Sequence, residues 1–182
     1  DGTAPEDLLA PVEAEVRRRA GEYLYGVDQD TLETVAGRAL AALGWTVGLA
    51  ESCTGGLIAA RLTNVPGSSA YFLGSVVAYS NEAKAQLLGV PPDVLAEHGA
   101  VSAPVAEAMA AGAMERLGAT MGVSVTGIAG PGGGTPEKPV GLVYIGLARG
   151  DWREVHRLQL AGDRERIRWD TSQAALDLIR RH

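Results

Sequence analysis

The sequence predicts a single α/β domain in which helices cover both faces of a mixed β-sheet, with a helical linker ahead of it. Short apolar stretches alternate with helix-like stretches through most of the chain, an order typical of sheets wrapped by helices. Only Arg149-Gly150-Asp151 separates the last two apolar stretches, which indicates a closing antiparallel hairpin. With 182 residues, 46% of them hydrophobic, the chain has the length of one such domain and cannot hold two of full size.

The linker is expected over residues 1–30 and the main domain over residues 31–182. Near the N-terminus, apolar residues recur with the spacing of one helical face: Leu8, Leu9, Val12 and Val16. This spacing predicts a helix over residues 6–24, which the stretch 21–30 interrupts. The alternative is that this helix is an integral part of the domain.

Within the domain, the apolar and polar patterns predict strands and helices in alternation. Strands are expected at 45–51, 73–79, 119–126, 141–148 and 152–160, and helices at 31–43, 52–63, 80–88, 102–117 and from 163 onward. Gly44 and Gly89 stand where two of the helices should end. Ser80, Ser102 and Asp163 stand where three others should begin, as N-cap residues do.

Composition excludes several classes of protein. A net charge of −6 and an absence of basic, aromatic-rich stretches argue against direct nucleic-acid contact. No apolar run approaches the length of a membrane span, and the acidic first residues do not resemble a signal peptide. The single cysteine, Cys53, cannot form an intrachain disulfide and suits a reducing, cytoplasmic compartment.

Metal binding is not expected from residue spacing. The three histidines, His98, His156 and His182, are far apart in sequence, and none is spaced with Cys53 as zinc ligands are. We therefore predict neither a metal nor a cofactor.

The first motif with catalytic potential is AESCTGG, residues 50–56. It should bring Ser52 from a strand to the start of a helix, where the following N–H groups are unpaired and can hold an oxyanion or an anionic substrate. Gly55 and Gly56 would allow close approach of the backbone. The alternative is that Ser52 only caps the helix, which contributes about 1 kcal/mol. Cys53 lacks a histidine to deprotonate it, so we expect it to pack in the core.

The second motif is AYSNEAK, residues 78–84. Only two of the 16 basic residues are lysines, Lys84 and Lys138, and lysine, unlike arginine, can lose its proton in a protein. If Ser80 caps a helix, Lys84 lies in its first turn, where the helix dipole disfavours the ammonium. With burial added, Lys84 could act as a neutral base for a serine nucleophile. The alternative is a solvated surface lysine.

Two further stretches could bind an anion. Residues 124–139, SVTGIAGPGGGTPEKP, follow a strand end, where open α/β sheets bind ligands, but match neither a Walker A loop nor a dinucleotide fingerprint. They predict either a flexible loop whose amides contact phosphate or ribose, or an exposed hairpin-like loop. In residues 162–169, Arg164, Arg166 and Arg168 oppose a helix dipole, so at least one should have an anionic partner: a phosphate, or an Asp or Glu of the same chain.

In this order, AESCTGG, PGSS at 66–69, VVAYSNEAK, TGIAGPGGG and GDRERIRW resemble the CinA C-terminal domain family, the nicotinamide-nucleotide amidases. The resemblance covers about residues 30–180. It implies hydrolysis of nicotinamide mononucleotide to nicotinate mononucleotide and ammonia, without a metal. It also implies a homodimer, and residues 6–30 resemble the linker that follows an N-terminal nucleotide-processing domain in full-length members.

The resemblance also implies roles for single residues. Ser52 would be the nucleophile and Lys84 its base, with Tyr79 and Ser69 also in the active site. The residues expected to contact substrate are Thr54, Gly55, Gly56, Thr126, Gly127 and Arg166. The residue types support such chemistry independently, because amide hydrolysis needs a nucleophile, a proton carrier and donors to the oxyanion.

Two other functions fit the same motifs. One is a non-catalytic nucleotide-binding or interaction module linked to competence, which would release no ammonia and be indifferent to Ser52→Ala. The other is a Ser–Lys amidase or peptidase acting on other amides. The glycine-rich loop and the arginine cluster favour a nucleotide over a peptide.

Overall fold

The computed structural model describes residues 5–182, which fall into two compact units divided between Thr31 and Leu32. The first unit contains helix α1 (Pro5–Ala20) and the short 3-10 turn η1 (Gly21–Tyr23). The predicted N-terminal helix is confirmed, although it ends at Ala20.

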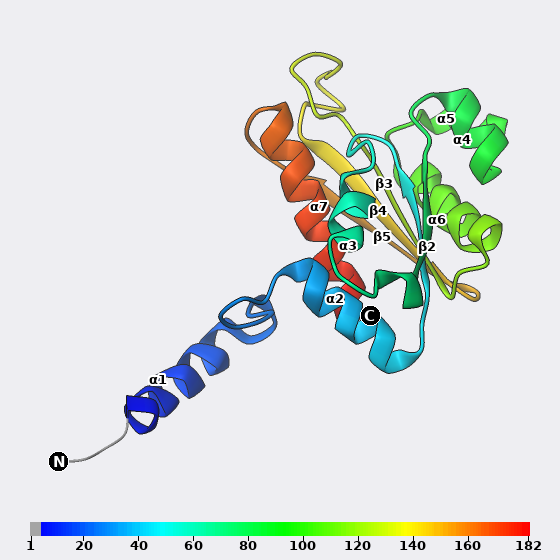
Figure 1. The fold of residues 1–182 in the computed structure, drawn as a ribbon. Coiled ribbons are helices and arrows are strands. Elements are labelled where there is room, and N and C mark those ends of the chain that lie inside the picture. The colour runs from blue at the N-terminus through cyan, green and yellow to red at the C-terminus, as the bar shows by residue number, and fades with distance from the viewer. Residues whose placement is uncertain (1–4) are drawn as a thin grey trace. The chain divides into compact units, whose positions relative to one another are not determined.

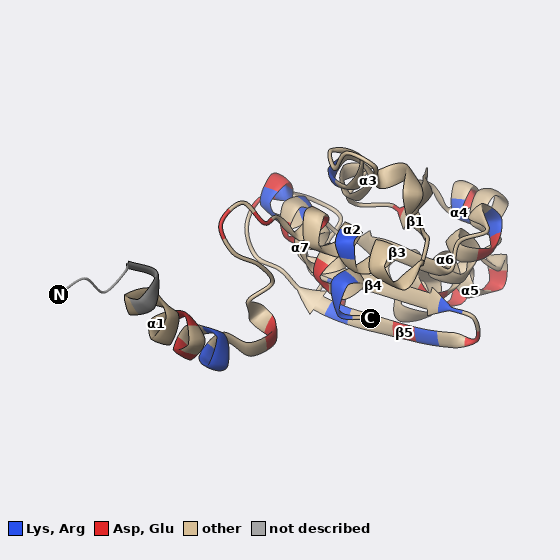
Figure 2. Ribbon diagram, turned by 60° about the horizontal axis from the view of Figure 1, so that its bottom comes forward, with Lys and Arg blue, Asp and Glu red and all other residues tan. Residues whose placement is uncertain are grey.

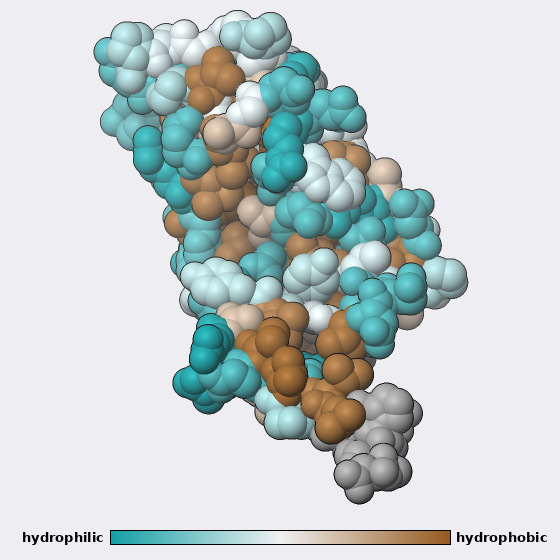
Figure 3. Space-filling view, turned by 90° about the vertical axis from the view of Figure 1, so that its left-hand side faces the viewer, coloured by the Kyte–Doolittle hydropathy of each residue, from teal (hydrophilic) through white to brown (hydrophobic). Residues whose placement is uncertain are grey.

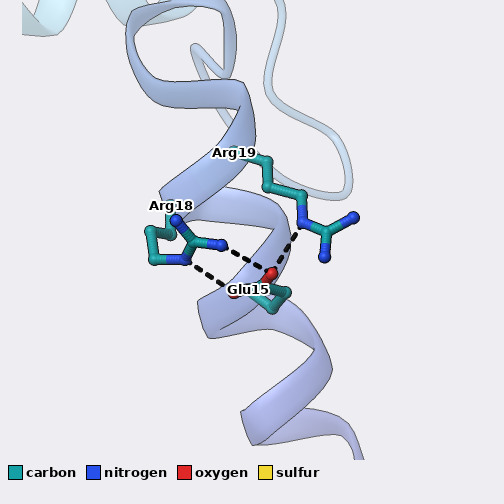
Figure 4. Close-up of polar contacts among 3 residues, drawn as sticks. All are labelled: Glu15, Arg18 and Arg19. Atoms are coloured by element: carbon teal, nitrogen blue, oxygen red, sulfur yellow. Dashed lines mark hydrogen bonds and ion pairs between the residues drawn. The ribbon is translucent and has the colours of Figure 1, made fainter.

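Helix α1 has one apolar side and one charged side. Leu8, Leu9 and Val12 are each at least 60% exposed, and Figure 3 shows brown side chains gathered on this helix. On the charged side, Glu15 accepts hydrogen bonds from Arg18 at 2.7 Å and Arg19 at 2.6 Å (Figure 4). These guanidinium groups, Arg18 first, hold the pKa of Glu15 below its ordinary value.

The second unit, Leu32–His182, is built on one five-stranded mixed sheet. Its strands are β1 (Val47–Glu51), β2 (Phe72–Val77), β3 (Met121–Gly127), β4 (Leu142–Arg149) and β5 (Trp152–Gln159). They lie in the order β2-β1-β3-β4-β5 (Figure 1). Strands β2, β1 and β3 are parallel, whereas β4 is antiparallel to both of its neighbours. The predicted mixed sheet and closing hairpin are therefore confirmed.

Helices pack on both faces of this sheet, as predicted. One face is covered by α2 (Leu32–Leu43), α3 (Leu57–Thr63) and α7 (Arg164–Arg181), and the other by α4 (Asn81–Leu88), α5 (Pro92–His98) and α6 (Ala103–Leu117). Helix α6 lies close to the strands because Gly122 and Gly146 face its backbone: a Cβ at either position would collide with the carbonyl of Ala110 or Ala106.

Three details differ from the sequence prediction. Helix α3 begins at Leu57 rather than Ser52, because Gly55 and Gly56 adopt left-handed φ angles of +62° and +94° that a helix cannot contain. Helix α5 was not expected: the prolines after Gly89 indicated a helix end, but Pro92 is instead the first residue of a new helix. Ser102 is the N-cap residue of α6 as predicted, but its hydroxyl donates to the carbonyl of Gly99 at 2.8 Å and accepts no N–H of the helix.

None of the helices described between residues 5 and 182 combines the length and apolar character needed to cross a bilayer.

Candidate active site

The site is built where strand β1 ends, at the edge of the sheet that also carries the carboxyl ends of β2 and β3. Successive residues of a strand point to opposite faces, so Glu51 and Ser52 diverge. Glu51 contacts α3 on one face, and Ser52 contacts Lys84 of α4 on the other. The Ser52 N–H donates to the carbonyl of Val125 at 3.1 Å, which ties the residue to β3.

Glu51 forms the cap of helix α3. Its fully buried carboxylate accepts hydrogen bonds from five donors: the Thr54 hydroxyl at 2.7 Å, the Ser75 hydroxyl at 3.2 Å, and the N–H groups of Gly56 at 3.0 Å, Ile58 at 3.1 Å and Ala59 at 2.9 Å. A carboxylate at this position satisfies the N–H groups that a helix start leaves open. Ser52 is therefore not the cap of this helix.

Helix α4 places Lys84 beneath Ser52. Ser80 caps the helix, because its hydroxyl accepts from the Ala83 N–H at 3.1 Å, and Lys84 follows in the first turn as predicted. The Lys84 side chain is only 1% exposed, so the surface-lysine alternative is wrong. Its Nζ lies 3.1 Å from Ser52 Oγ, 2.9 Å from the carbonyl oxygen of Ala78 and 3.4 Å from that of Tyr79.

The surroundings of Lys84 favour the loss of its proton more than water does. Burial lowers the pKa of Lys84, and no carboxylate of the described residues forms an ion pair with it. An ammonium has three hydrogens to donate, whereas a neutral amine has two hydrogens and one lone pair. Nζ donates to Ser52 Oγ as well as to the carbonyls of Ala78 and Tyr79. Once the amine has lost its proton, its lone pair can accept the Ser52 hydroxyl proton. The pair therefore has the contact needed for a serine nucleophile and its base.

The chain segment after Ser52 offers fewer free donors than the sequence indicated. The N–H of Gly55 donates to the Ser52 carbonyl at 3.1 Å, and the N–H of Gly56 and the hydroxyl of Thr54 both donate to Glu51. The expected substrate contacts of these residues stay predictions, and the groups named here make internal hydrogen bonds in this structure. The N–H groups of Cys53 and Thr54 both hydrogen-bond to the thiol of Cys53. Sulfur is a weak acceptor, so these two are the donors that an oxyanion would have to recruit.

Cys53 is not a competing nucleophile. Its side chain is 6% exposed and packs in the core, as expected. Desolvation on burial raises the pKa of its thiol to about 12, so the reactive thiolate is not formed near neutral pH.

Two arginines at the start of α7 reach toward this edge of the sheet, and neither is Arg166. Arg164 donates to the Tyr79 hydroxyl at 2.9 Å and to the carbonyl of Gly130 at 2.8 Å. Arg168 donates to the carbonyl of Thr54 at 2.7 Å. Both bind neutral acceptors, so their positive charges are not matched by these contacts. Figure 2 shows acidic and basic residues together on these first turns of α7.

Arg166 instead has an acidic partner in the same chain. Its Nε lies 2.7 Å from the carboxylate of Asp170, one turn further along α7, and its side chain is 66% exposed. Its backbone N–H donates to the Asp163 carboxylate at 2.8 Å, which confirms Asp163 as the helix cap. The substrate contact of Arg166 stays a prediction, and it would compete with this ion pair.

Tyr79, Thr126 and Gly127 lie at the same sheet edge as Ser52. The Tyr79 side chain is 60% exposed, and its ring carries the hydroxyl that Arg164 contacts. Thr126 is buried, and its hydroxyl donates to the carbonyl of Ala100 at 2.8 Å, so it positions the chain before α6. Gly127 leaves no room for a side chain against Val143.

Ser69 is not brought to this site. It is exposed in the 3-10 turn Ser68–Ala70, just before β2 begins. Strand register pairs Phe72 with Val47, the first residue of β1, whereas Ser52 follows the last residue. At about 3.3 Å per residue, the two serines lie at opposite edges of the sheet.

The glycine-rich stretch forms the loop of the β3–β4 hairpin and is exposed over residues 131–137. Contact of its amides with phosphate or ribose stays a prediction. Arg164 holds this loop through Gly130, and Lys138 donates to the carbonyl of His98 at 2.7 Å.

Sequence reasoning missed Glu51, although its place directly before Ser52 was visible in AESCTGG. It also left open which arginines face the site, because that depends on how α7 is rotated on the sheet.

Comparison with known proteins gives consistent matches. The profile of the CinA C-terminal domain matches residues 29–182. A putative competence-damage inducible protein of Moorella thermoacetica is 54% identical over 176 residues, which are 97% of this chain and 42% of that protein. The chain thus spans less than half the length of this curated relative.

Solved structures match equally well. The competence/damage inducible protein of Agrobacterium tumefaciens superposes with a TM-score of 0.78 at 42% identity, over 85% of this chain and 96% of that one. A CinA superfamily protein of Escherichia coli superposes with a TM-score of 0.79 at 29% identity, over 90% of this chain and 98% of that one.

Proposed function

We propose, on the premise that the chain belongs to the CinA C-terminal domain family, that it hydrolyses nicotinamide mononucleotide to nicotinate mononucleotide and ammonia. The observation that carries the proposal is the 3.1 Å contact between Ser52 Oγ and the buried amine of Lys84. This contact supports nucleophilic attack on an amide. The substrate itself is inferred from the motif resemblance.

The reaction would proceed through an ester on Ser52. Lys84 takes the hydroxyl proton as Oγ attacks the amide carbon, and the N–H groups of Cys53 and Thr54 hold the oxyanion. The resulting Lys84 ammonium returns the proton to the departing nitrogen, which leaves as ammonia. Lys84 then deprotonates a water that cleaves the ester, giving the acid product and free Ser52.

The two unmatched arginines support a substrate that carries a phosphate. Arg164 and Arg168 hydrogen-bond to groups on or beside the catalytic segment, and their guanidinium groups suit phosphate oxygens. A pocket of about 570 Å³ is lined by Leu57, Arg168, Trp169 and Arg166, together with the carboxylates of Asp163 and Glu165. Neither Ser52 nor Lys84 lines it, so the proposal rests on the arginine contacts and not on this pocket. Arg166, which also lines this pocket, is held by Asp170. We therefore assign phosphate binding to Arg164 and Arg168. We also propose that Tyr79 relays the proton from the Lys84 ammonium to the leaving nitrogen.

The test is product formation from nicotinamide mononucleotide, scored as ammonia and as nicotinate mononucleotide. Wild-type protein should release both, and Ser52→Ala should abolish release, with circular dichroism verifying the fold of each. The matched control is Cys53→Ala, which removes the neighbouring side chain but keeps both N–H donors and should retain activity. Loss of activity in Cys53→Ala together with retention in Ser52→Ala would overturn the assignment.

The same assay separates the alternatives. Binding of the nucleotide by folded wild-type protein without ammonia release would favour the non-catalytic module. Release of ammonia from simple amides but not from the nucleotide would favour a general Ser–Lys amidase. The linker role of residues 1–30, a preceding nucleotide-processing domain, the homodimer and the cytoplasmic location stay predictions.

A further inference from the structure

Three potential metal ligands meet at the end of α7, on the edge strand β5. They are Glu154, His156 and His182, whose ligand atoms all lie within 4.8 Å of one another. A carboxylate oxygen of Glu154 lies 2.9 Å from His156 Nε2, and the other lies 3.6 Å from His182 Nε2. Sequence spacing gave no sign of this cluster, because folding brings its third member from 26 positions further along the chain.

The fold positions each of the three side chains. Glu154 and His156 are two residues apart on β5, so they point to the same face of the sheet. Trp152 and Leu158 belong to the same alternation and pack against the core beneath α7. His182 directly follows α7, and its ring lies 5.0 Å from that of Trp152. Each side chain is about one-third exposed, so an ion could reach the cluster from solvent.

The donor set has the chemistry of a zinc site. Two imidazole nitrogens and one carboxylate oxygen are typical ligands of Zn²⁺, with bonds of about 2.0–2.2 Å in a tetrahedral shell. Ligand atoms in such a shell lie about 3.3–3.5 Å apart. The three ligand atoms here lie within 4.8 Å of one another, and two different Glu154 oxygens lie 2.9 Å and 3.6 Å from the two imidazoles, so small side-chain rotations would have to complete the shell.

One nitrogen of the cluster, His156 Nε2, lacks a hydrogen-bond partner. His156 Nε2 is buried, and it completes no hydrogen bond of acceptable geometry among the described residues, even though a Glu154 oxygen is near. Buried polar atoms without a partner are rare in folded proteins, and a bound ion is one explanation of them. This atom belongs to the donor set, and its missing partner is the feature of the set that points to a bound ion.

We infer that Glu154, His156 and His182 bind one zinc ion that fastens the end of α7 to β5. The site is separate from Ser52 and Lys84, because three strand spacings of about 4.8 Å each separate β5 from β1. The ion would therefore stabilise the domain without entering the hydrolytic reaction. Three protein ligands leave one position of a tetrahedral shell for water.

The experiment is calorimetric titration of chelator-treated protein with zinc chloride, in parallel with cobalt(II) absorption spectra. We expect one ion per chain, a tetrahedral cobalt spectrum, and a rise in Tm of about 5 °C when zinc reaches 100 times its Kd. His156→Ala and Glu154→Gln should each weaken zinc binding about 100-fold or more. His98→Ala is the matched control: this histidine lies beside Glu97 at 3.7 Å and outside the cluster, so its removal should leave Kd unchanged.

His182→Gln keeps the test valid if the strand variants unfold, because it alters only a residue beyond the helix. It should lose zinc binding while its Tm without metal stays close to that of the wild type. The wild type should bind zinc at a concentration of about 0.1 mM, where even a site of weak affinity is largely occupied. Failure to bind would overturn the proposal and leave Glu154 as an ordinary ion-pair partner of two histidines. Equal binding by wild type, His156→Ala and His182→Gln would overturn it too.

Discussion

Glu51 and Ser52 are neighbours in sequence, yet their side chains lie on opposite faces of the sheet and differ in how many hydrogen bonds they form. The Glu51 carboxylate is fully buried and accepts from five donors, three of them N–H groups at the start of α3. The Ser52 hydroxyl is 8% exposed and contacts a single side-chain amine, that of Lys84. On one face, the hydrogen bonds of Glu51 fix the backbone at the start of α3. On the other face, the Ser52 hydroxyl contacts only the Lys84 amine among side chains and can still react.

This division decides where an anionic substrate can be held. A free helix N-terminus binds phosphate readily, but Glu51 already occupies that of α3 with its own negative charge. A phosphate must therefore be bound by other groups, and Arg164 and Arg168 are the positive charges at this edge without an acidic partner in their described contacts. The glutamate thus excludes the anion site that the motif first suggested.

The largest expected effect falls on the Ser52 face. Lys84→Met fills the same space without a base, so product formation should fall by about 10³-fold or more, since general-base catalysis contributes about 10²–10⁴-fold and the nucleophile also depends on it. Initial rates of ammonia release measure this. The control is Lys138→Met, which removes the other lysine from its contact with His98 and should change the rate by less than about threefold. Undiminished turnover in Lys84→Met would remove the proposed base.

The next effect falls on the Glu51 face, and it is one of stability. Glu51→Ala leaves three buried or partly buried N–H groups and two hydroxyls without their acceptor, so the free energy of unfolding should fall by about 3 kcal/mol or more. Urea denaturation measures it. Glu107→Ala, at an exposed position on α6, should stay within about 0.5 kcal/mol of wild type. A Glu51→Ala protein as stable as this control would contradict the structural role given to the carboxylate.

These two residues also mark how far sequence reasoning reached. Apolar periodicity and residues at helix ends predicted the sheet, the closing hairpin and the placement of Lys84, because these depend on local pattern. The helix was expected to begin at Ser52, with Ser52 as its cap being one of two alternatives. The start is five residues later and Glu51 is the cap, because Gly55 and Gly56 form a left-handed turn that the sequence pattern did not indicate. The α7 arginines and the Glu154–His182 cluster could not be predicted, since tertiary packing alone sets which side chains face each other.

A smaller effect distinguishes the arginines. Arg168→Ala and Arg164→Ala should each raise KM for the nucleotide about tenfold, because a charge-assisted hydrogen bond to phosphate contributes about 1.5–3 kcal/mol. Arg166→Ala should change KM less than about twofold, since an exposed ion pair with Asp170 is all that it loses. Steady-state kinetics with nicotinamide mononucleotide gives each value. If Arg166→Ala showed the largest rise in KM, the assignment from α7 geometry would be wrong.

The smallest effect is the pH dependence of stability on the Ser52 face. Burial lowers the pKa of Lys84 from its ordinary value of 10.5, so the folded chain releases this proton at a lower pH than the unfolded chain does. Between the two pKa values the unfolded state binds more protons, and stability therefore rises with pH in that window. Below the lowered pKa the full cost is present, about 1.4 kcal/mol for each unit by which the pKa is lowered.

Lys84→Met removes this term and leaves all other titrations in place. The variant should be more stable than wild type at neutral pH, and the difference should shrink as the pH approaches 10.5. Urea denaturation of both proteins at a series of pH values measures that difference directly. A constant difference across the series would mean that Lys84 titrates alike in the folded and unfolded chain. The amine beneath Ser52 would then be an ordinary ammonium, and the contrast with the saturated Glu51 face would lose its chemical meaning.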